Sequence, residues 1–180
     1  MCPVRSPDVV SPSLTPTSYV VLGLVGAFGP CTSYNLKQFV SVSIGYFWPF
    51  PHSQLYAEPV RLTELGLLKE EQETTGRKRR TYKLTPAGRE ALGDWLAEPN
   101  DEPTEIRDLS VLKLFFGAQA EDGDVAAIAR HAVDAHRRRL AEYEQIARNT
   151  GIEAHQRKTL EMGLEFERMA IAFWEGVATQ

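Results

Sequence analysis

Residues 53–88 constrain the fold of this chain more than any other stretch. They begin with apolar residues at helical spacing, and Gly66 marks the end of that helix. Two strand-like segments follow at 67–73 and 78–84, with two threonines and a glycine suited to the reversal between them. A Thr-Pro pair at 85–86 then marks the start of another helix. The sequence therefore predicts a helix, an antiparallel hairpin and a second helix in direct succession.

Positive charge is concentrated on the predicted hairpin. The segment 77–83 contains five cations and no carboxylate, namely Arg77, Lys78, Arg79, Arg80 and Lys83. Side chains alternate along a strand, so Arg77 and Arg79 are expected on one side and the two cations next to them on the other. A solvated charge run is one interpretation. Because the run lies on a hairpin beside a helix, we favour contact with nucleic-acid phosphates.

The residues before this stretch predict two more helices. Residues 1–14 contain three prolines and three serines, and we expect them to form a flexible tail. Apolar periodicity and a Thr-Pro start predict a helix over 15–29, which ends at a Gly-Pro pair. Thr32 or Ser33 is expected to cap a second helix over 34–42.

The resulting order of elements is that of a winged helix-turn-helix, a module that binds duplex DNA. We expect it to occupy residues 15–98. Ser53 is predicted to cap its third helix, and Pro59 to kink that helix or shorten its first segment. The fourth helix is predicted to bury Leu92, Trp95 and Leu96.

Helical periodicity continues after a boundary at 99–103. Helices are predicted over 106–120, 124–149 and 152–178, and we expect a helical dimerisation domain at 104–180. The apolar surface of the last helix is wider than one narrow stripe, which favours pairing with a second copy of the chain. The alternative is an intramolecular three-helix cluster packed on the first domain. The predicted fold class is mainly α with a small β-hairpin wing.

Charge is distributed unevenly between these two parts. Residues 1–98 carry 10 Lys and Arg against 9 Asp and Glu, whereas residues 99–180 carry 10 against 15. The net charge of -4 therefore arises in the second part. This asymmetry suits a first part that meets an anion and a second part that does not.

Other classes of function find little support in the sequence. Cys2 and Cys31 form neither a disulfide framework nor a zinc spacing, which fits a reducing cytoplasm. The longest apolar run, residues 19–28, is too short to span a bilayer. His131 and His136 are five residues apart, so they do not share one helix face for a metal. With no phosphate-binding glycine loop or nucleophile motif, we expect no enzyme, no metal and no cofactor.

Several passages carry a resemblance to a known family. They are Ser53-Gln-Leu-Tyr56, Arg61-Leu62 followed by Glu64-Leu-Gly-Leu-Leu68, Thr81-Tyr-Lys-Leu-Thr-Pro-Ala-Gly-Arg89, Glu105-Ile-Arg-Asp108 and Leu112-Lys-Leu-Phe-Phe116. On these motifs, over about residues 15–180, the chain resembles the longer members of the PadR family of bacterial transcriptional regulators. The resemblance implies a winged helix joined to a helical dimerisation region, usually acting as a repressor. It also implies a response to small hydrophobic or phenolic effectors near the dimer interface.

The expected DNA contacts follow from how a helix-turn-helix docks. Its second helix enters the major groove amino end first, which places Ser53, Gln54 and Tyr56 nearest the bases. The Gln54 amide can donate and accept at once and so match adenine, the alternative being an exposed glutamine that touches only water. Arg61 and Tyr34 are expected at phosphates, with local packing as an equal alternative. The wing cations Arg77, Lys78, Arg79 and Arg80 are expected to supply salt-dependent affinity.

Two further interpretations remain open at this level. Five aromatic residues could line an effector pocket, although plain core is the interpretation we favour: Trp95, Phe115, Phe116, Phe173 and Trp174. The winged helix also serves as a protein–protein docking platform, so an adaptor without sequence-specific DNA binding is the alternative function. A symmetric DNA-binding dimer instead predicts an inverted-repeat operator with half-sites about 10 bp apart, or a multiple of that spacing.

Overall fold

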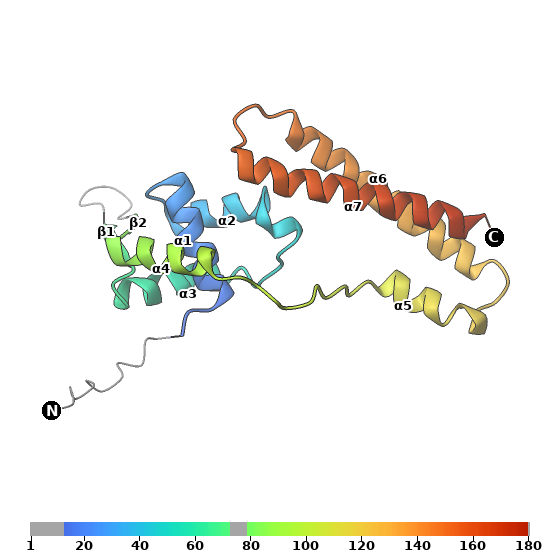
Figure 1. Cartoon of the computed structure of the whole chain (residues 1–180), viewed down its shortest axis with the longest axis horizontal. Helices are drawn as coiled ribbons and strands as arrows, with labels where there is room; N and C mark the ends of the chain where they lie inside the picture. The colour runs from blue at the N-terminus through green and yellow to red at the C-terminus, as the bar shows by residue number, and fades with distance from the viewer. Residues whose placement is uncertain (1–12, 73–78, 180) are drawn as a thin grey trace. The chain divides into compact units, whose positions relative to one another are not determined.

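The computed structural model describes residues 13–72 and 79–179. The chain divides into two compact units, Met1–Glu102 and Pro103–Gln180, each with its own core (Figure 1). The described residues are mostly helical, and their one sheet is a two-stranded antiparallel hairpin. The predicted fold class is therefore confirmed. None of the helices in these ranges is both long and apolar enough to cross a membrane.

The first two helices begin at the threonines that their sequences indicate. Helix α1 (Pro16–Phe28) has Thr15 at its N-cap, whose side chain accepts from the Ser18 N–H. Helix α2 (Ser33–Ser41) is capped in the same way by Thr32, so of the two candidates it is Thr32 that caps. Helix α1 ends at Gly29, whose φ of 78° lies in the left-handed region that favours glycine.

A linker with the short helix η1 (Ile44–Tyr46) leads to helix α3 (Gln54–Glu64). The prediction that Ser53 caps α3 was wrong, because Ser53 has helical backbone angles and its side chain makes no capping hydrogen bond. Helical turns already begin with the Gln54 N–H to Pro51 carbonyl bond, so Ser53 lies inside a turn. Helix α3 continues without a break through Pro59, whose ring is buried in the core.

The hairpin pairs β1 (Leu68–Gln72) with β2 (Arg80–Leu84), in a register that sets Leu68 opposite Leu84 and Gln72 opposite Arg80. The predicted reversal at 74–76 lies outside the described residues. An isolated bridge joins Tyr82 to Cys31 through two backbone hydrogen bonds of 2.9 and 3.1 Å. The hairpin is thereby tied to the start of α2 as well as to α3.

Helix α4 (Pro86–Ala97) completes the first unit and is capped by Thr85, as its Thr-Pro start predicts. Its Leu92 packs against the core, but Trp95 and Leu96 are 42% and 69% exposed, so the prediction that α4 buries them was wrong. Trp95 instead stacks on the Tyr19 ring with centroids 4.6 Å apart. Helix α4 packs against α1, while its last residues, 93–97, are exposed.

The core of the first unit is apolar and draws on every helix around α1 as well as on the hairpin. Its fully buried members are Val21, Leu22, Leu36, Leu55, Leu62 and Leu68. Burial of each such side chain contributes roughly 1.5–3 kcal/mol relative to exposure. This core fixes which side of α3 faces outward.

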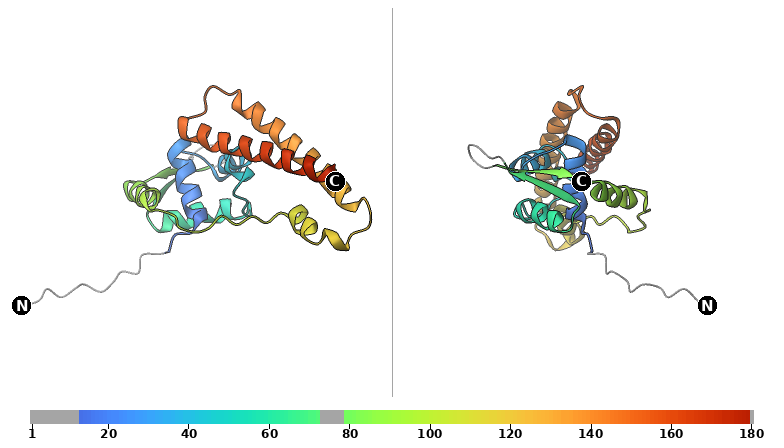
Figure 2. Two further views of the ribbon diagram at one scale, coloured as in Figure 1. Left: turned by 45° about the vertical axis from the view of Figure 1, so that its right-hand side comes forward. Right: turned by 90° about the vertical axis from the view of Figure 1, so that its left-hand side faces the viewer.

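The second unit is a pair of long antiparallel helices with a short one beside them (Figure 2). Helix α6 (Asp124–Ala147) lies along α7 (Ala154–Ala178), and their shared core contains the buried Trp174. Helix α5 spans only Leu109–Phe115 and is followed by η2 (Gly117–Gln119), so the helix predicted over 106–120 is shorter at its start. Asp108 causes this later start, because its carboxylate accepts from the Ser110 N–H at 2.7 Å.

Candidate nucleic-acid interface

The amino end of α3 presents polar side chains on its outward side. Leu55 and Leu62 anchor the inward side of the helix in the core. Ser53 and Gln54 are exposed, and Tyr56 is 49% exposed. The three residues that the sequence nominates as base readers are thus held at the exposed end of a rigid helix. An amide, a hydroxyl and a phenol there can hydrogen-bond base edges.

Gln54 is not free to rotate as an isolated surface side chain would. Its amide oxygen accepts a 2.9 Å hydrogen bond from the hydroxyl of Thr17 on α1. Gln54 therefore contacts Thr17 as well as solvent, and its contact with DNA stays a prediction. No local sequence signal could have revealed this contact, since its partners lie 37 residues apart.

The Arg61 side chain is held by contacts with other residues of the chain, although it is 38% exposed. Its guanidinium forms a 2.7 Å ion pair with Glu58 and donates to the Ser13 carbonyl at 2.9 Å. Ser18, which is fully buried, donates to the same Glu58 carboxylate at 2.6 Å. These contacts favour the packing role over the phosphate contact, two roles that the sequence left at even odds. Arg61 joins α3 to the start of α1.

Tyr34 lies in the first turn of α2 and is 61% exposed. Its hydroxyl oxygen accepts from the Gln38 side-chain amide at 3.4 Å, a long hydrogen bond. That arrangement leaves the phenolic proton available to donate. Of the two expected phosphate contacts, Tyr34 is therefore the one whose geometry suits that role.

The described part of the wing carries both signs of charge. Arg79 and Arg80 are exposed, and Arg80 lies 3.5 Å from Glu70 on the opposite strand. Lys69 and Glu71 are 3.1 Å apart, and this hydrogen bond and charge lower the pKa of Glu71. Sequence reasoning missed these carboxylates, because they precede the basic run along the chain and oppose it only after pairing. The predicted contacts Arg77 and Lys78 lie outside the described residues.

Tyr82 joins the wing to the helix-turn-helix. It is 2% exposed, and burial together with the charge of Glu70 raises the pKa of its phenol. Its backbone pairs with that of Cys31, whose buried thiol has its pKa raised to about 11 by desolvation. The Cys31 thiol therefore stays protonated and packs as a small apolar side chain. The bridge thus fixes β2 to the residues that directly precede α2.

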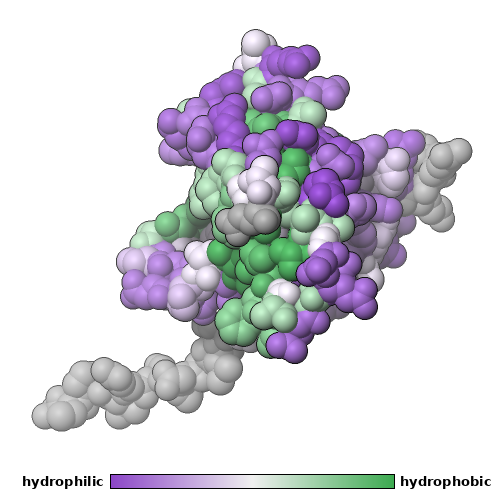
Figure 3. All heavy atoms as spheres, turned by 90° about the vertical axis from the view of Figure 1, so that its right-hand side faces the viewer, coloured by the Kyte–Doolittle hydropathy of each residue, from purple (hydrophilic) through white to green (hydrophobic). Residues whose placement is uncertain are grey.

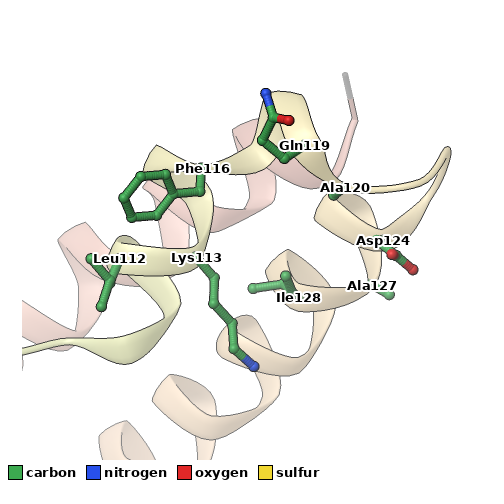
Figure 4. Close-up of a pocket in the computed structure, with 8 residues that line it drawn as sticks. All are labelled: Leu112, Lys113, Phe116, Gln119, Ala120, Asp124, Ala127 and Ile128. Atoms are coloured by element: carbon green, nitrogen blue, oxygen red, sulfur yellow. The ribbon is translucent and has the colours of Figure 1, made fainter.

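The aromatic residues nominated for an effector pocket do not form one set. Trp174 is 1% exposed in the core between α6 and α7, whereas Phe115 is 81% exposed. A pocket of about 570 Å³ lies between α5, η2 and the first turns of α6, and of the nominated residues only Phe116 lines it (Figure 4). Trp95 belongs to the other unit. Trp174 is therefore a core residue, in line with the interpretation that the sequence favoured.

The second unit exposes a large amount of apolar surface. Hydrophobic side chains gather on the face of the molecule that carries α5 and the neighbouring ends of α6 and α7 (Figure 3). More than two fifths of the area of each of the following side chains is exposed: Leu109, Val111, Leu112, Phe115, Phe116, Met162, Phe166, Met169 and Phe173. Apolar surface of this extent marks an interaction site more often than an ordinary monomer surface.

Across residues 13–72 and 79–179 there is no cluster of three or more potential metal ligands.

Comparison with known proteins assigns both units. Residues 21–94 match the model of the Transcriptional regulator PadR-like family, and residues 106–180 match Virulence activator alpha C-term. The Negative transcriptional regulator PadR of Bacillus subtilis (strain 168) is 32% identical over 100 residues. That match covers 54% of this chain and 54% of the relative, about half of the length of each.

Two solved structures of Bacillus subtilis PadR share the fold. The complex with operator DNA superposes with a TM-score of 0.81 at 22% identity, covering 93% of this chain and 98% of that one. The complex with p-coumaric acid gives a TM-score of 0.74 at 23% identity, covering 92% and 97%. Taken with the winged helix and the helical second unit, these matches confirm the resemblance read from the sequence. This chain thus contains a PadR-like transcriptional regulator domain at residues 21–94, followed at residues 106–180 by a region that matches the Virulence activator alpha C-term family.

Proposed function

We propose that the chain is a homodimeric repressor that recognises an inverted-repeat operator through the amino end of α3. The observation that carries this proposal is the exposed set Ser53, Gln54 and Tyr56 at the start of a helix whose other side is anchored in the core. A helix-turn-helix reads bases with that end of that helix. Support comes from Bacillus subtilis PadR, which has the same fold and was solved in complex with operator DNA.

Gln54→Ala is expected to reduce discrimination between operator and unrelated DNA, because one base-edge contact disappears. A good bidentate base contact is worth about 1–3 kcal/mol of discrimination, roughly fivefold to 150-fold. Fluorescence anisotropy with labelled duplexes measures both affinities. Gln145→Ala, an exposed glutamine on α6, is the matched control and should leave the ratio unchanged. Equal loss of affinity for operator and scrambled duplex would argue against base reading by Gln54.

Exchange of the wing cations Arg77 and Arg79 for alanine is expected to weaken binding to every DNA sequence. Each phosphate contact contributes about 0.9 to the slope of log affinity against log salt, so losing two should flatten that slope by about 1.8. Titration at four salt concentrations gives the slope. Arg107→Ala, in the second unit, is the control because its side chain is similarly cationic and highly exposed. An unchanged slope in the double variant would exclude Arg77 and Arg79 from the phosphate contacts.

The homodimer is proposed from the exposed apolar side chains of α5 and α7, such as Phe115 and Met162. Stable interfaces bury about 1,200–2,000 Å² in total and have apolar centres, which this surface can provide. Sedimentation equilibrium of the full chain should give twice the chain mass of 20.2 kDa. A monomer at micromolar concentration would remove both the dimer and the inverted-repeat operator from the proposal.

Release by a small hydrophobic or phenolic effector is a further part of the proposal. It is supported by the solved complex of Bacillus subtilis PadR with p-coumaric acid. A panel of aromatic acids should then quench tryptophan fluorescence and lower operator affinity together. If no compound does either, the effector part of the proposal is refuted, and the DNA-binding part still stands. A DNA-binding regulator of this kind would act in the cytoplasm.

A mobility-shift assay against the DNA upstream of the chain's own gene tests the proposal as a whole. We expect a salt-sensitive shift that an excess of scrambled duplex does not compete away. The alternative, a winged-helix adaptor that binds another protein, gives no sequence-dependent shift.

A further inference from the structure

The start of α1 reaches across to the proposed reading end of α3. Thr17 is the second residue of α1 and is partly buried, and its hydroxyl donates to the Gln54 amide oxygen at 2.9 Å. Gln54 itself is exposed. The contact therefore contributes little to the core. In the free protein it engages the oxygen end of the Gln54 amide.

A second contact holds the two helices in this position. Ser18, the next residue of α1, donates to Glu58 at 2.6 Å, and Glu58 lies one helical turn after Gln54. The Arg61 guanidinium completes the cluster through its 2.7 Å ion pair with Glu58. Two successive residues of α1 thus hold two successive turns of α3. A partly buried contact between Ser18 and Glu58 therefore lies beside the exposed hydrogen bond between Thr17 and Gln54 and holds α1 and α3 together there.

The occupied oxygen changes what Gln54 can recognise. A glutamine pairs with adenine by donating to N7 and accepting from N6, which needs both ends of the amide. The hydrogen bond from Thr17 occupies one of the two lone pairs of the Gln54 oxygen and fixes the direction of the other, whereas it leaves both N–H groups of the nitrogen free to donate. Guanine presents two adjacent acceptors in the major groove, N7 and O6. On the basis of the proposed DNA-binding function, we propose that Thr17 is a specificity-determining residue that orients the Gln54 amide to favour guanine over adenine.

The test begins with the unchanged full chain and a random duplex library, from which the preferred site is selected. The base pair that Gln54 reads is the one where Gln54→Ala loses discrimination. At that position the unchanged protein should prefer guanine to adenine. Thr17→Val removes the hydroxyl at nearly constant shape, frees the Gln54 oxygen, and should shift the preference towards adenine by about fivefold or more.

Thr17→Ser keeps a hydroxyl and should retain the guanine preference, which a role in packing alone would not predict. Thr17→Val should also keep the salt slope of the unchanged protein, because no phosphate contact is altered. The proposal is overturned if the unchanged protein prefers adenine at that position, or if Thr17→Val leaves the base order as it was. The first of these outcomes is measured on the unchanged protein. The proposal can therefore be refuted even if a variant of Thr17 fails to fold. Failure of the library to enrich any sequence would instead refute the proposed function, and this inference with it.

Discussion

Gly88→Ala is expected to destabilise the first unit by about 3 kcal/mol or more and to abolish DNA binding. A Cβ at Gly88 would lie 2.1 Å from the carbonyl oxygen of Leu67, far inside contact distance. Overpacking in a core costs about 1–3 kcal/mol when side chains can rearrange, and more when they cannot. Here the obstacle is backbone, so no rotamer change relieves the clash.

The clash also falls on the junction that joins the hairpin to α4. The Leu67 carbonyl accepts from the backbone N–H of Thr85 at 3.1 Å and from its hydroxyl at 3.0 Å. The same hydroxyl caps α4 by accepting from the Gly88 N–H. A displaced Leu67 carbonyl would lose both hydrogen bonds to Thr85. The start of α4 should then come away from the base of the hairpin.

Urea unfolding followed by circular dichroism measures this loss, and the same helix provides a matched control. A Cβ at Gly93 would meet nothing within 4 Å, so Gly93→Ala should raise stability by about 0.5–1 kcal/mol through helix propensity. The two glycine-to-alanine changes are therefore expected to have opposite signs. Equal unfolding midpoints for the two variants would contradict the close packing of α4 on the hairpin.

Trp174→Ala is expected to cost about 3–5 kcal/mol in the second unit, the range observed for large aromatic residues removed from cores. Trp174 is the largest fully buried side chain of the described chain and packs with Ala129 and Val133 of α6. These neighbours are small or branched, so they cannot expand to fill the space. The α6–α7 pair should lose its cooperative unfolding transition.

Phe173→Ala provides the comparison from the next position in α7. Phe173 is 48% exposed, so its removal should cost the isolated chain much less than removal of Trp174. If α7 contributes to the dimer interface, Phe173→Ala should instead shift the monomer–dimer equilibrium towards monomer. Calorimetry at several concentrations separates the two effects. Equal loss of stability in the two variants at high dilution would contradict the assigned core of the second unit.

Much of the fold could be predicted because its start and stop signals are local. Thr15 and Thr85 cap helices in the structure through hydrogen bonds to residues three positions ahead, which sequence spacing reveals. Gly29 ends α1 because only glycine adopts its backbone angles at little cost. Ser53 has the residue type of a cap but not its function, because the preceding Pro51 and His52 already begin the turn.

Burial was harder to predict than helix boundaries, since it depends on what packs against each face. The apolar periodicity of α4 is genuine, yet Leu96 is 69% exposed, and Trp95 is 42% exposed even though its ring stacks on that of Tyr19. Their hydrophobicity could not reveal that the last residues of α4 are exposed. Similarly, the aromatic residues of α7 divide between the buried Trp174 and the exposed Phe173, a difference set by the position of α6.

The candidate site was predicted where it depends on chain order and missed where it depends on pairing. The sequence predicts that the amino end of α3 reads bases, because α3 follows α2 as the second helix of the helix-turn-helix. The contacts of Arg61 with Ser13 and Glu58 and that of Gln54 with Thr17 arise only when α1 and α3 meet in space. The contacts of Arg61 favour a structural role for this residue over the phosphate contact that the sequence offered as an equal alternative.

The most direct test of the account is to map where the start of α3 lies on DNA. Ala57 is exposed on α3 beside the proposed readers, so Ala57→Cys with Cys2→Ser allows an iron chelate to be attached there, since Cys31 is buried. Hydroxyl radicals from the chelate should cut bound operator in two clusters related by symmetry, about 10 bp apart or a multiple of that spacing. The unattached chelate serves as the control. Uniform cutting, or cutting no stronger than the control, would contradict the placement of two α3 helices in the grooves.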